Sequence, residues 1–400
     1  MRILKVVQFY YPFLEKGGPV VKVRALAGAL AKRGHSVTVL TADWGLDSRN
    51  GRDLNAQRCE WGWRAAENGV QTLYLSSIAR YRALTLNPRV IRFCRSSLKG
   101  FDVVHFYGLY DLLGPAVSFR CRRTSLPYVI EPMGMYRPID RGFRRKSLWH
   151  RSVGNAFCAG ARKFVATADL ERQTLVEEGI PSDKIVVRHN GVDSELAVAA
   201  RAARGQFRQK WSIPANERLI LFLSRLIPRK GADVLIDAFA RACPNSGRLL
   251  IAGPEGEPGY RAYLETHARH SGVGDRVIFT GPLYETDKAA ALADSDLFVL
   301  PSRYENFANV AAEAMVCGVP VIVSDACGIS SLVEGKAGLV VPAQTDAVAE
   351  ALRKLIDDAA LYARFKAGCL QVAAELSWDH LAAQMETYYA QALATRGALT

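Results

Sequence analysis

Short apolar runs rich in β-branched residues alternate with longer helix-like patterns from one end of this chain to the other. Such runs are typical of strands buried on both faces, and their alternation with helices is typical of parallel sheets built from β–α–β units. The chain is therefore predicted to be an α/β protein. We expect strands at residues 3–11, 36–42, 70–76, 102–107, 128–131, 163–168 and 184–189, and then at 219–225, 248–252, 276–280, 297–301, 320–325 and 338–341.

The strand pattern falls into two series, and 400 residues exceed what one hydrophobic core usually serves. Turn residues at 190–193 close the first series. We therefore expect two doubly wound, Rossmann-like parallel-sheet domains that face each other across a cleft, joined by a linker at about 192–208. Their predicted bounds are residues 1–195 and 209–375, followed at 376–400 by a C-terminal helix able to pack back on the first domain.

The eight cysteines are scattered, with no Cys-x-x-Cys pair and no histidine at zinc-ligand spacing, which favours reduced, structural thiols. No apolar run approaches the roughly 18 residues that a membrane-spanning helix needs. Met1 opens directly onto the first strand pattern, without an apolar secretory segment. We therefore expect a cytoplasmic protein.

Positive charge is concentrated in the first half of the chain. Residues 1–200 hold 31 Lys and Arg against 17 Asp and Glu, a net charge of +14, whereas residues 201–400 hold 21 against 22. The excess gathers in residues 80–99 and 137–163, where aromatic and aliphatic residues are interleaved. Such a surface suits an anionic partner, and we expect anionic lipid, with a merely solvated basic face as the alternative.

The segment at residues 297–318 reads as a strand, a loop and a helix that ends before Gly318. We expect the helix to begin just after Glu305, so that the backbone N–H groups of residues 306–309 face a phosphate. Glu313 falls one turn further on the same side. Two carboxylates here suit the hydroxyl groups of a sugar and a ribose, although an isolated glutamate pair is more often a solvated surface feature.

Two cations follow the first strand of the second domain. Arg225 ends that strand, and Lys230 lies in the next loop, before Gly231 and a helix expected at 232–242. Because ligands of parallel sheets bind at the carboxyl ends of strands, both cations are expected beside the two glutamates. They are able to neutralise a diphosphate without a metal ion, whereas the alternative is an ordinary solvated turn.

Asp294-Ser295-Asp296 spells Asp-x-Asp, a pattern that holds divalent cations in many enzymes. It precedes its strand, so we expect it at the amino edge of the sheet, far from the ligand edge. We interpret it as a cap and turn, and we expect no metal site.

In the first domain, Gly17 and Gly18 lie between the first strand and its helix, in a loop that a ligand is able to approach closely. A plain tight turn is the alternative. His105 and Tyr107 alternate along the strand at 102–107, with Tyr107 nearer its carboxyl end. His105 is a candidate catalytic residue, although a lone histidine in a strand is more often packed in the core.

Together these motifs resemble glycosyltransferase family 4, the retaining sugar transferases of GT-B architecture, and in particular members that assemble bacterial surface polysaccharide. The match extends over nearly the whole chain. It rests on the order and spacing of Gly17-Gly18, residues 102–108, 167–171 and 190–193, Arg225 with Lys230-Gly231, residues 251–253 and 279–281, Glu305 with Glu313, and residues 318–324.

The resemblance implies that Arg225 and Lys230 bind the diphosphate of a UDP- or GDP-sugar, and that Glu313 holds its ribose. Glu305 would hold the donor sugar near the reacting face. Transfer would proceed with retention, without a metal or a cofactor, because the nucleotide sugar is itself the substrate. The remaining expected donor-site residues are Gly17, Gly18, Gly281, Asn306, Phe307 and Ala308.

This sequence departs from the family pattern at two places. Members often read Glu-Gly-Phe-Gly where this chain reads Glu305-Asn306-Phe307-Ala308, and the added side chains are expected to alter which sugar fits. Tyr107 stands where many relatives carry a second histidine.

The expected acceptor is a saccharide or a lipid-linked saccharide, reached by peripheral binding at the inner face of the plasma membrane. One alternative is a nucleic-acid-binding protein, but the basic stretches carry no reading motif and the carboxylates would repel phosphates, so no nucleic acid is expected. Another is a phosphorylase or a sugar-nucleotide epimerase of the same architecture, which phosphorolysis or acceptor-free epimerisation would reveal.

Overall fold

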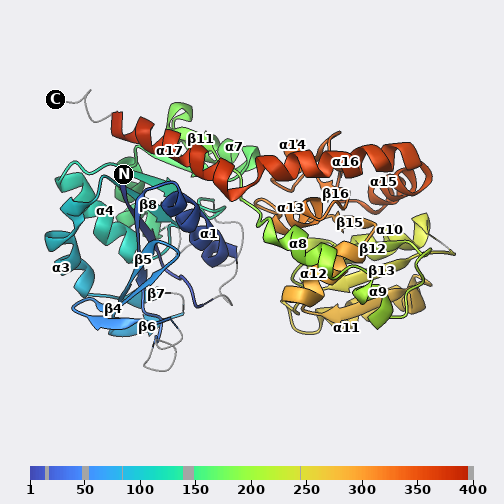
Figure 1. Cartoon of the computed structure of the whole chain (residues 1–400). Helices are drawn as coiled ribbons and strands as arrows, with labels where there is room; N and C mark the ends of the chain where they lie inside the picture. Colours follow the sequence, from blue (N-terminus) through green and yellow to red (C-terminus); the bar gives the residue numbers. More distant parts are fainter. Residues whose placement is uncertain (14–17, 47–53, 83, 138–147, 244, 395–400) are drawn as a thin grey trace. The chain divides into compact units, whose positions relative to one another are not determined.

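The computed structural model describes residues 1–13, 18–46, 54–82, 84–137, 148–243 and 245–394 (Figure 1). Contacts divide the chain into two compact units. Unit 1 comprises Met1–Asn190 with the C-terminal segment from Trp378, and unit 2 comprises Gly191–Ser377. Each unit is a largely parallel sheet flanked by helices, which confirms the α/β prediction.

Unit 1 contains a nine-stranded sheet in the order β11-β10-β9-β8-β1-β2-β5-β4-β3. The strands from β11 to β5 pair in parallel, and β4 and β3 extend the edge in antiparallel fashion. A separate hairpin pairs β6 with β7. The bounds are β1 Arg2–Val7, β2 Ser36–Ala42, β3 Gln57–Cys59, β4 Gly62–Glu67, β5 Val70–Leu75, β6 Ala79–Tyr81, β7 Leu84–Leu86, β8 Val103–Tyr107, β9 Tyr128–Glu131, β10 Lys163–Ala166 and β11 Ile185–Val187.

Helices cover both faces of this sheet because successive strand residues point to opposite sides. Ile3 and Val7 of β1 belong to the core under α1 and α17, whereas Leu4 and Val6 belong to the core under α3, α4 and α6. The last helix of the chain, α17, therefore completes the core of the first unit through residues that include Met385. The helices are α1 Gly18–Lys32, α3 Arg89–Ser96, α4 Leu113–Arg123, α6 Asn155–Ala159, α7 Asp169–Glu177 and α17 Trp378–Ala394.

Unit 2 contains a six-stranded, fully parallel sheet in the order β14-β13-β12-β15-β16-β17. This is the doubly wound order, and the parallel part of unit 1 follows it as well. The strands are β12 Leu219–Leu223, β13 Arg248–Ala252, β14 Val277–Gly281, β15 Leu297–Leu300, β16 Val321–Ser324 and β17 Gly338–Val341. The helices are α8 Glu195–Ala202, α9 Gln206–Lys210, α10 Ala232–Ala242, α11 Tyr260–His270, α12 Glu285–Asp294, α13 Asn309–Val316, α14 Ser330–Val333, α15 Thr345–Asp357 and α16 Ala359–Glu375.

The structure adds strands and helices to the sequence-based expectations in both units. Strands β3, β4, β6 and β7 were not expected, because they are short or carry exposed charged residues such as Arg64 and lack the continuous apolar run that marks a buried strand. The segment expected to be a linker contains α8 and α9, which bury Ala200 and Phe207 within unit 2.

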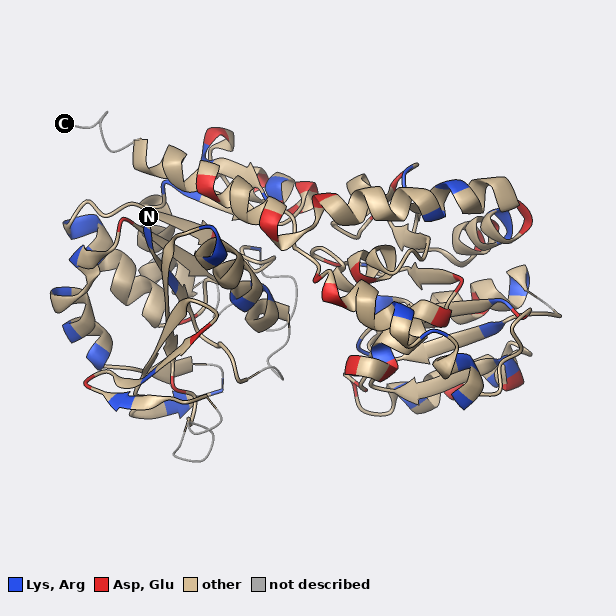
Figure 2. Cartoon of the chain, in the orientation of Figure 1, with Lys and Arg blue, Asp and Glu red and all other residues tan. Residues whose placement is uncertain are grey.

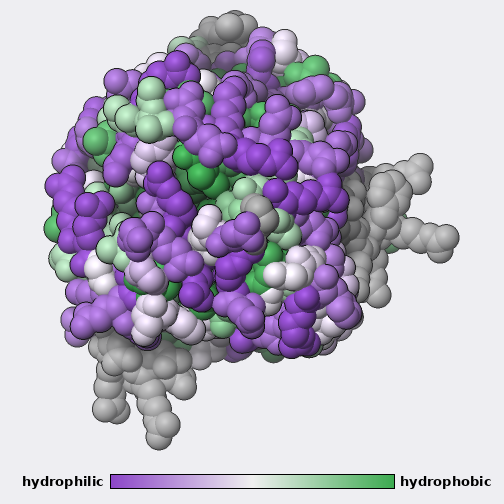
Figure 3. All heavy atoms as spheres, turned by 90° about the vertical axis from the view of Figure 1, so that its right-hand side faces the viewer, coloured by the Kyte–Doolittle hydropathy of each residue, from purple (hydrophilic) through white to green (hydrophobic). Residues whose placement is uncertain are grey.

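Charge and hydropathy are unevenly distributed over the surface. Figure 2 shows Lys and Arg repeated along α3 of unit 1, where Arg89, Arg92 and Arg95 are exposed. Figure 3 turns the right-hand side of Figure 1 toward the viewer and shows a face that is mostly hydrophilic, with small, separate apolar patches. Within the described residues, no helix is both long enough and apolar enough to cross a bilayer.

Candidate active site

The carboxyl edge of the sheet in unit 2 holds the loops that carry three predicted donor-site residues, Arg225, Lys230 and Glu305. Strands β12 and β15 are neighbours although they are not consecutive, so the strand order reverses between them. Such a switch point opens a crevice for ligands. The loop after β12 carries Arg225 and Lys230, and the loop after β15 carries Glu305.

Gly231 shows why these two loops lie against each other. It caps the amino end of α10 with a φ of 73°, in the left-handed region that favours glycine. A Cβ atom at this position would collide with the carbonyl oxygen of Pro301. The close backbone approach therefore requires glycine, and it holds Lys230 beside the β15 loop.

Lys230 and Glu305 form an ion pair across the crevice. The Lys230 side chain is 7% exposed and that of Glu305 is 23% exposed, so the pair is open to solvent mainly on the glutamate side. The backbone of Glu305 is fixed on both sides, because its N–H donates to Ala326 and its carbonyl accepts from Gly328. Arg225, five residues before Lys230 in the same loop, is exposed.

The helix after Glu305 starts later than the sequence predicted. Helix α13 begins at Asn309, and Ala308 precedes it in a left-handed conformation with φ 77° and ψ 63°. Asn306, Phe307 and Ala308 therefore form a loop instead of the first helical turn, because a left-handed residue interrupts the helix. Phe307 and Ala308 are buried, which leaves Asn306 as the partly exposed side chain of this loop.

Glu313 lies one turn into α13 and has a partner that the sequence did not suggest. The ammonium group of Lys288, on α12, lies 2.6 Å from Oε2 of Glu313. Both predicted carboxylates are therefore paired with lysines from other elements. Gly281, at the end of β14, adopts a φ of 75°, and its carbonyl accepts a hydrogen bond from the N–H of Gly253.

The Asp-x-Asp sequence has a structural role at the opposite edge of this sheet. Asp294 accepts hydrogen bonds from the backbone N–H groups of Gly205 and Arg208. Asp296 accepts from the N–H of Leu219 and from the guanidinium of Arg208. Through these hydrogen bonds the two carboxylates hold α9 and the start of β12 against the segment before β15, as expected of a cap and turn.

In unit 1, Gly18 opens α1, while Gly17 lies outside the described residues. His105, the candidate catalytic residue, is fully buried. Its Nδ1 lies 2.7 Å from the hydroxyl of Tyr389 and 3.2 Å from that of Tyr107. Burial lowers the pKa of His105 to about 3, so the ring is neutral. The structure thus places His105 in the core, because α17 covers this part of β8.

A buried cluster of charged residues surrounds His105. Glu131 is fully buried and pairs with Arg188, at 2.8 Å, and with Lys22. A third buried cation, Lys5, donates to the hydroxyl of Tyr107 at 2.5 Å. Although burial opposes ionisation of Glu131, Arg188 and Lys22 hold its pKa well below the usual value. Burial and the charge of Arg188 lower the pKa of Lys5.

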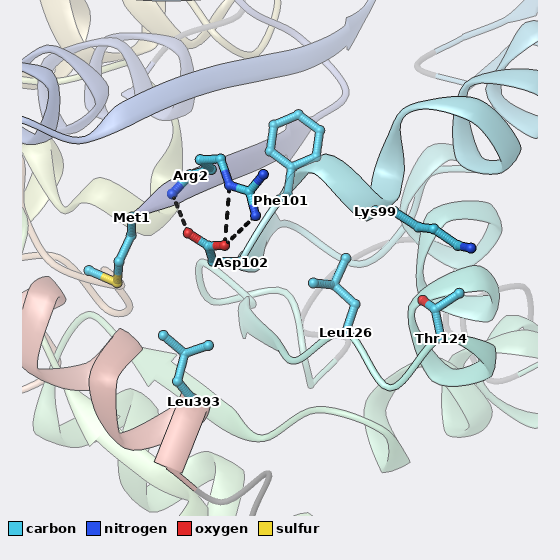
Figure 4. A pocket seen from close by; sticks show the side chains of 8 residues that line it. All are labelled: Met1, Arg2, Lys99, Phe101, Asp102, Thr124, Leu126 and Leu393. Atoms are coloured by element: carbon cyan, nitrogen blue, oxygen red, sulfur yellow. Dashed lines mark hydrogen bonds and ion pairs between the residues drawn. The ribbon is translucent and has the colours of Figure 1, made fainter.

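One hollow of unit 1 lies at the amino edge of its sheet. It has a volume of about 460 Å³ and is shown in Figure 4. Its polar wall is the ion pair between Arg2 and Asp102, at 2.8 Å, which lowers the pKa of Asp102. Ligands of parallel sheets bind at the carboxyl edge, so this hollow is at the wrong end for the predicted site.

Comparison with known protein families matches both units. A family model described as "Glycosyl transferases group 1" matches residues 203–368, and one described as "Glycosyltransferase Family 4" matches residues 16–196. A D-inositol 3-phosphate glycosyltransferase 1 of Catenulispora acidiphila is 32% identical over 326 residues, which are 76% of this chain and 77% of that protein.

Solved structures share the whole fold. Anabaena HepE in complex with UDP superposes with a TM-score of 0.77 at 22% identity, covering 98% of this chain and 100% of that one. WaaG, a glycosyltransferase involved in lipopolysaccharide biosynthesis, superposes with a TM-score of 0.65 at 18% identity, covering 97% of this chain and 99% of that one. At these identities, the likeness concerns the fold.

Proposed function

This chain belongs to glycosyltransferase family 4 and has the GT-B fold, and we propose that it transfers a sugar from a UDP- or GDP-sugar, with retention, to a saccharide or lipid-linked saccharide. The observation that carries the proposal is the pairing of Lys230 with Glu305 at the switch point of unit 2, beside the exposed Arg225. Cations and a hydroxyl-binding carboxylate are what a nucleotide sugar requires at one place.

The proposed donor site assigns one part of the ligand to each group. Arg225 and Lys230 neutralise the diphosphate, and Glu305 accepts hydrogen bonds from hydroxyls of the donor sugar. Glu313 holds the ribose, and the backbone at Asn306 and Phe307 contacts phosphate or sugar oxygens. Because Lys230 already contacts Glu305, diphosphate and sugar would meet on opposite sides of one preformed ion pair.

In the proposed reaction the bond between the anomeric carbon and the phosphate oxygen breaks, while the acceptor oxygen bonds to the same carbon on the same face. The acceptor proton passes to the leaving phosphate oxygen. Arg225 and Lys230 stabilise the negative charge that develops on this leaving group. Such electrostatic stabilisation of the transition state is usually the largest single contribution to catalysis. We propose no metal and no cofactor for this step, because the two cations supply the charge.

We propose that the loop containing Asn306 and Ala308 determines which donor sugar the site accepts. Where many family members carry two glycines, this chain adds an amide side chain and a methyl group. Asn306 is partly exposed and Ala308 is buried. We therefore assign Asn306 to contact with the donor sugar and Ala308 to the shape of the loop.

A nucleotide panel tests the donor site. Thermal unfolding is measured with UDP, GDP, ADP and their sugars, since a ligand at one hundred times its Kd adds about 2.7 kcal/mol of stability. We expect one nucleotide series to raise the Tm, and Lys230→Ala to abolish most of that rise. Transfer activity that survives both Lys230→Ala and Glu305→Ala, or a panel without any shift, contradicts the proposal.

For the acceptor side, we propose peripheral binding to the inner face of the plasma membrane, in assembly of surface polysaccharide. Residues 77–101 contain six Lys and Arg and no Asp or Glu. Exposed apolar side chains accompany these cations, with Ile78 70% exposed, Tyr81 62% and Ile91 56%. Cations beside apolar side chains suit a layer of anionic headgroups, at about 1 kcal/mol for each cation near the surface.

Flotation with vesicles tests the membrane proposal. We expect binding to vesicles that contain phosphatidylglycerol, reversal by high salt, and strong weakening when Arg89, Arg92 and Arg95 are changed to Gln. The control of equal charge changes Arg353, Lys354 and Lys366 of unit 2 to Gln. The proposal that the basic face of unit 1 binds the membrane is contradicted if both triple variants lose vesicle binding equally, or if salt does not affect the binding.

A further inference from the structure

Lys288 is a charged residue near the donor site that none of the roles above uses. It belongs to the first turn of α12, which begins four residues after Gly281, and it reaches Glu313 on a different helix. The side chains of Lys288 and Glu313 are 25% and 23% exposed. The ion pair is therefore partly enclosed, and the exposed part of it is open to a ligand.

The two carboxylate oxygens of Glu313 are not equivalent. Oε2 is buried, and among the described residues Lys288 is the one cation within ion-pair distance of it. A buried carboxylate oxygen without a partner is costly, so Lys288 compensates a charge that would otherwise be unsatisfied. Oε1 is left as the oxygen able to face a ligand, with lone pairs for two hydroxyl groups.

Lys288 differs in this respect from its neighbour on the same helix. Asp287 pairs with Lys210 at 3.1 Å, and both side chains are more than half exposed. A pair of that kind contributes little, because water competes for both charges. The pair of Lys288 with Glu313 is more enclosed, and it ends on a residue of the proposed donor site.

We propose that Lys288 is a positioning residue that holds Oε2 of Glu313 so that Oε1 accepts hydrogen bonds from both ribose hydroxyls, which makes the site selective for ribonucleoside diphosphates. The inference rests on the proposed function, because Glu313 must meet a ribose for Lys288 to matter. The proposed contact is a charge-assisted hydrogen bond from a ribose hydroxyl to the carboxylate of Glu313, whose other oxygen is held in place by Lys288.

The test compares a nucleoside diphosphate with its 2′,3′-dideoxy counterpart, using whichever of UDP, GDP and ADP binds most tightly. Titration calorimetry gives the ratio of the two Kd values. We expect a ratio of at least about tenfold for the wild type, because two hydrogen bonds to a charged acceptor are lost. The ratio should fall to about one to threefold in Lys288→Met and recover in Lys288→Arg.

Lys210→Met is the matched control, because it breaks the exposed ion pair to Asp287 on the same helix. It should keep the wild-type ratio. Inorganic pyrophosphate provides the second control, since its binding depends on Lys230 and should be equal in the wild type and in Lys288→Met.

Each outcome bears on one idea. If Lys288→Met binds both nucleotides more weakly by the same factor, the lysine only ties α12 to α13, and the inference is overturned while the proposed function stands. The inference is also overturned if the wild type binds the nucleoside diphosphate and its dideoxy counterpart with equal Kd values. A wild type that binds no nucleoside diphosphate removes the proposed function, and the inference with it.

Discussion

Two glutamates, one in each unit, show how the same kind of ion pair serves different ends. Glu131 closes β9 of unit 1 and pairs with Lys22, whereas Glu305 follows β15 of unit 2 and pairs with Lys230. Each lysine follows the first strand of its sheet, and each pair lies toward the carboxyl edge. Glu131 is fully buried, but the side chain of Glu305 is 23% exposed. A ligand is thus able to reach Glu305, whereas Glu131 serves the protein itself.

The surroundings of the two glutamates explain this difference. Unit 1 gathers Lys5, Lys22 and Arg188 near one carboxylate, and α17 covers the neighbouring His105 through Tyr389. Unit 2 places one lysine on each carboxylate and leaves Arg225 exposed. Buried charges need permanent partners, while partly exposed ones can exchange a partner for a ligand.

Removal of one charge from each unit gives the largest expected contrast. Glu131→Gln leaves buried cations without their counter-charge and should cost about 3 to 5 kcal/mol of the free energy of unfolding, or prevent folding altogether. Glu305→Gln should cost less than Glu131→Gln, because one cation instead of two loses its partner and the Glu305 side chain is 23% exposed. Urea unfolding followed by fluorescence measures both, and similar costs would remove the distinction between the two pairs.

The pH dependence of stability tests the burial of His105. Its pKa is lowered to about 3 in the folded protein, against about 6.5 when unfolded, so the unfolded chain binds more protons in this window. Stability should therefore fall as the pH falls. From pH 7.5 to 5 the wild type should lose about 2 kcal/mol more than His105→Gln. Parallel pH profiles of the two proteins would show that His105 titrates normally and is open to solvent.

The cover over His105 should contribute less than the charge of Glu131. Tyr389→Phe removes the hydroxyl that lies 2.7 Å from His105, and it should cost about 1 to 2 kcal/mol because the partner stays buried. Tyr388→Phe is the control, since its hydroxyl donates to Val187 from a half-buried position. A smaller loss for Tyr389→Phe than for Tyr388→Phe would contradict the importance of this contact.

The smallest expected effect is a gain, and it concerns unit 2. Ala308→Gly should raise the free energy of unfolding by about 0.5 to 1 kcal/mol, because glycine adopts a φ of 77° without strain. Gly231→Ala, at a φ of 73° in the facing loop, should instead destabilise strongly, since its Cβ meets Pro301. Thermal unfolding measures both, and a loss of stability in Ala308→Gly would mean that the methyl group packs better than the strained backbone costs.

The features that could be predicted from the sequence depend on the periodicity of apolar residues and on the order of strands and loops along the chain. Buried parallel strands follow from apolar runs, and the approach of Lys230 to Glu305 follows from the rule that ligand loops share one sheet edge. The ion pair of Lys288 was not predictable, because it depends on how α12 and α13 are rotated against each other. The surroundings of Glu131 were missed because Lys5, Lys22 and Arg188 come from distant segments. The left-handed Ala308 was missed because alanine ordinarily continues a helix.

The place of α17 has a consequence for synthesis of the chain on the ribosome. Ala382, Met385 and Tyr389 complete the core of unit 1, although they are made after all of unit 2. During translation, the first 190 residues therefore have one face of their sheet only partly covered, by α1, and His105 lacks the hydroxyl of Tyr389. Unit 2 has its whole sequence available first. The half of the protein that emerges earliest is thus the half that finishes folding last.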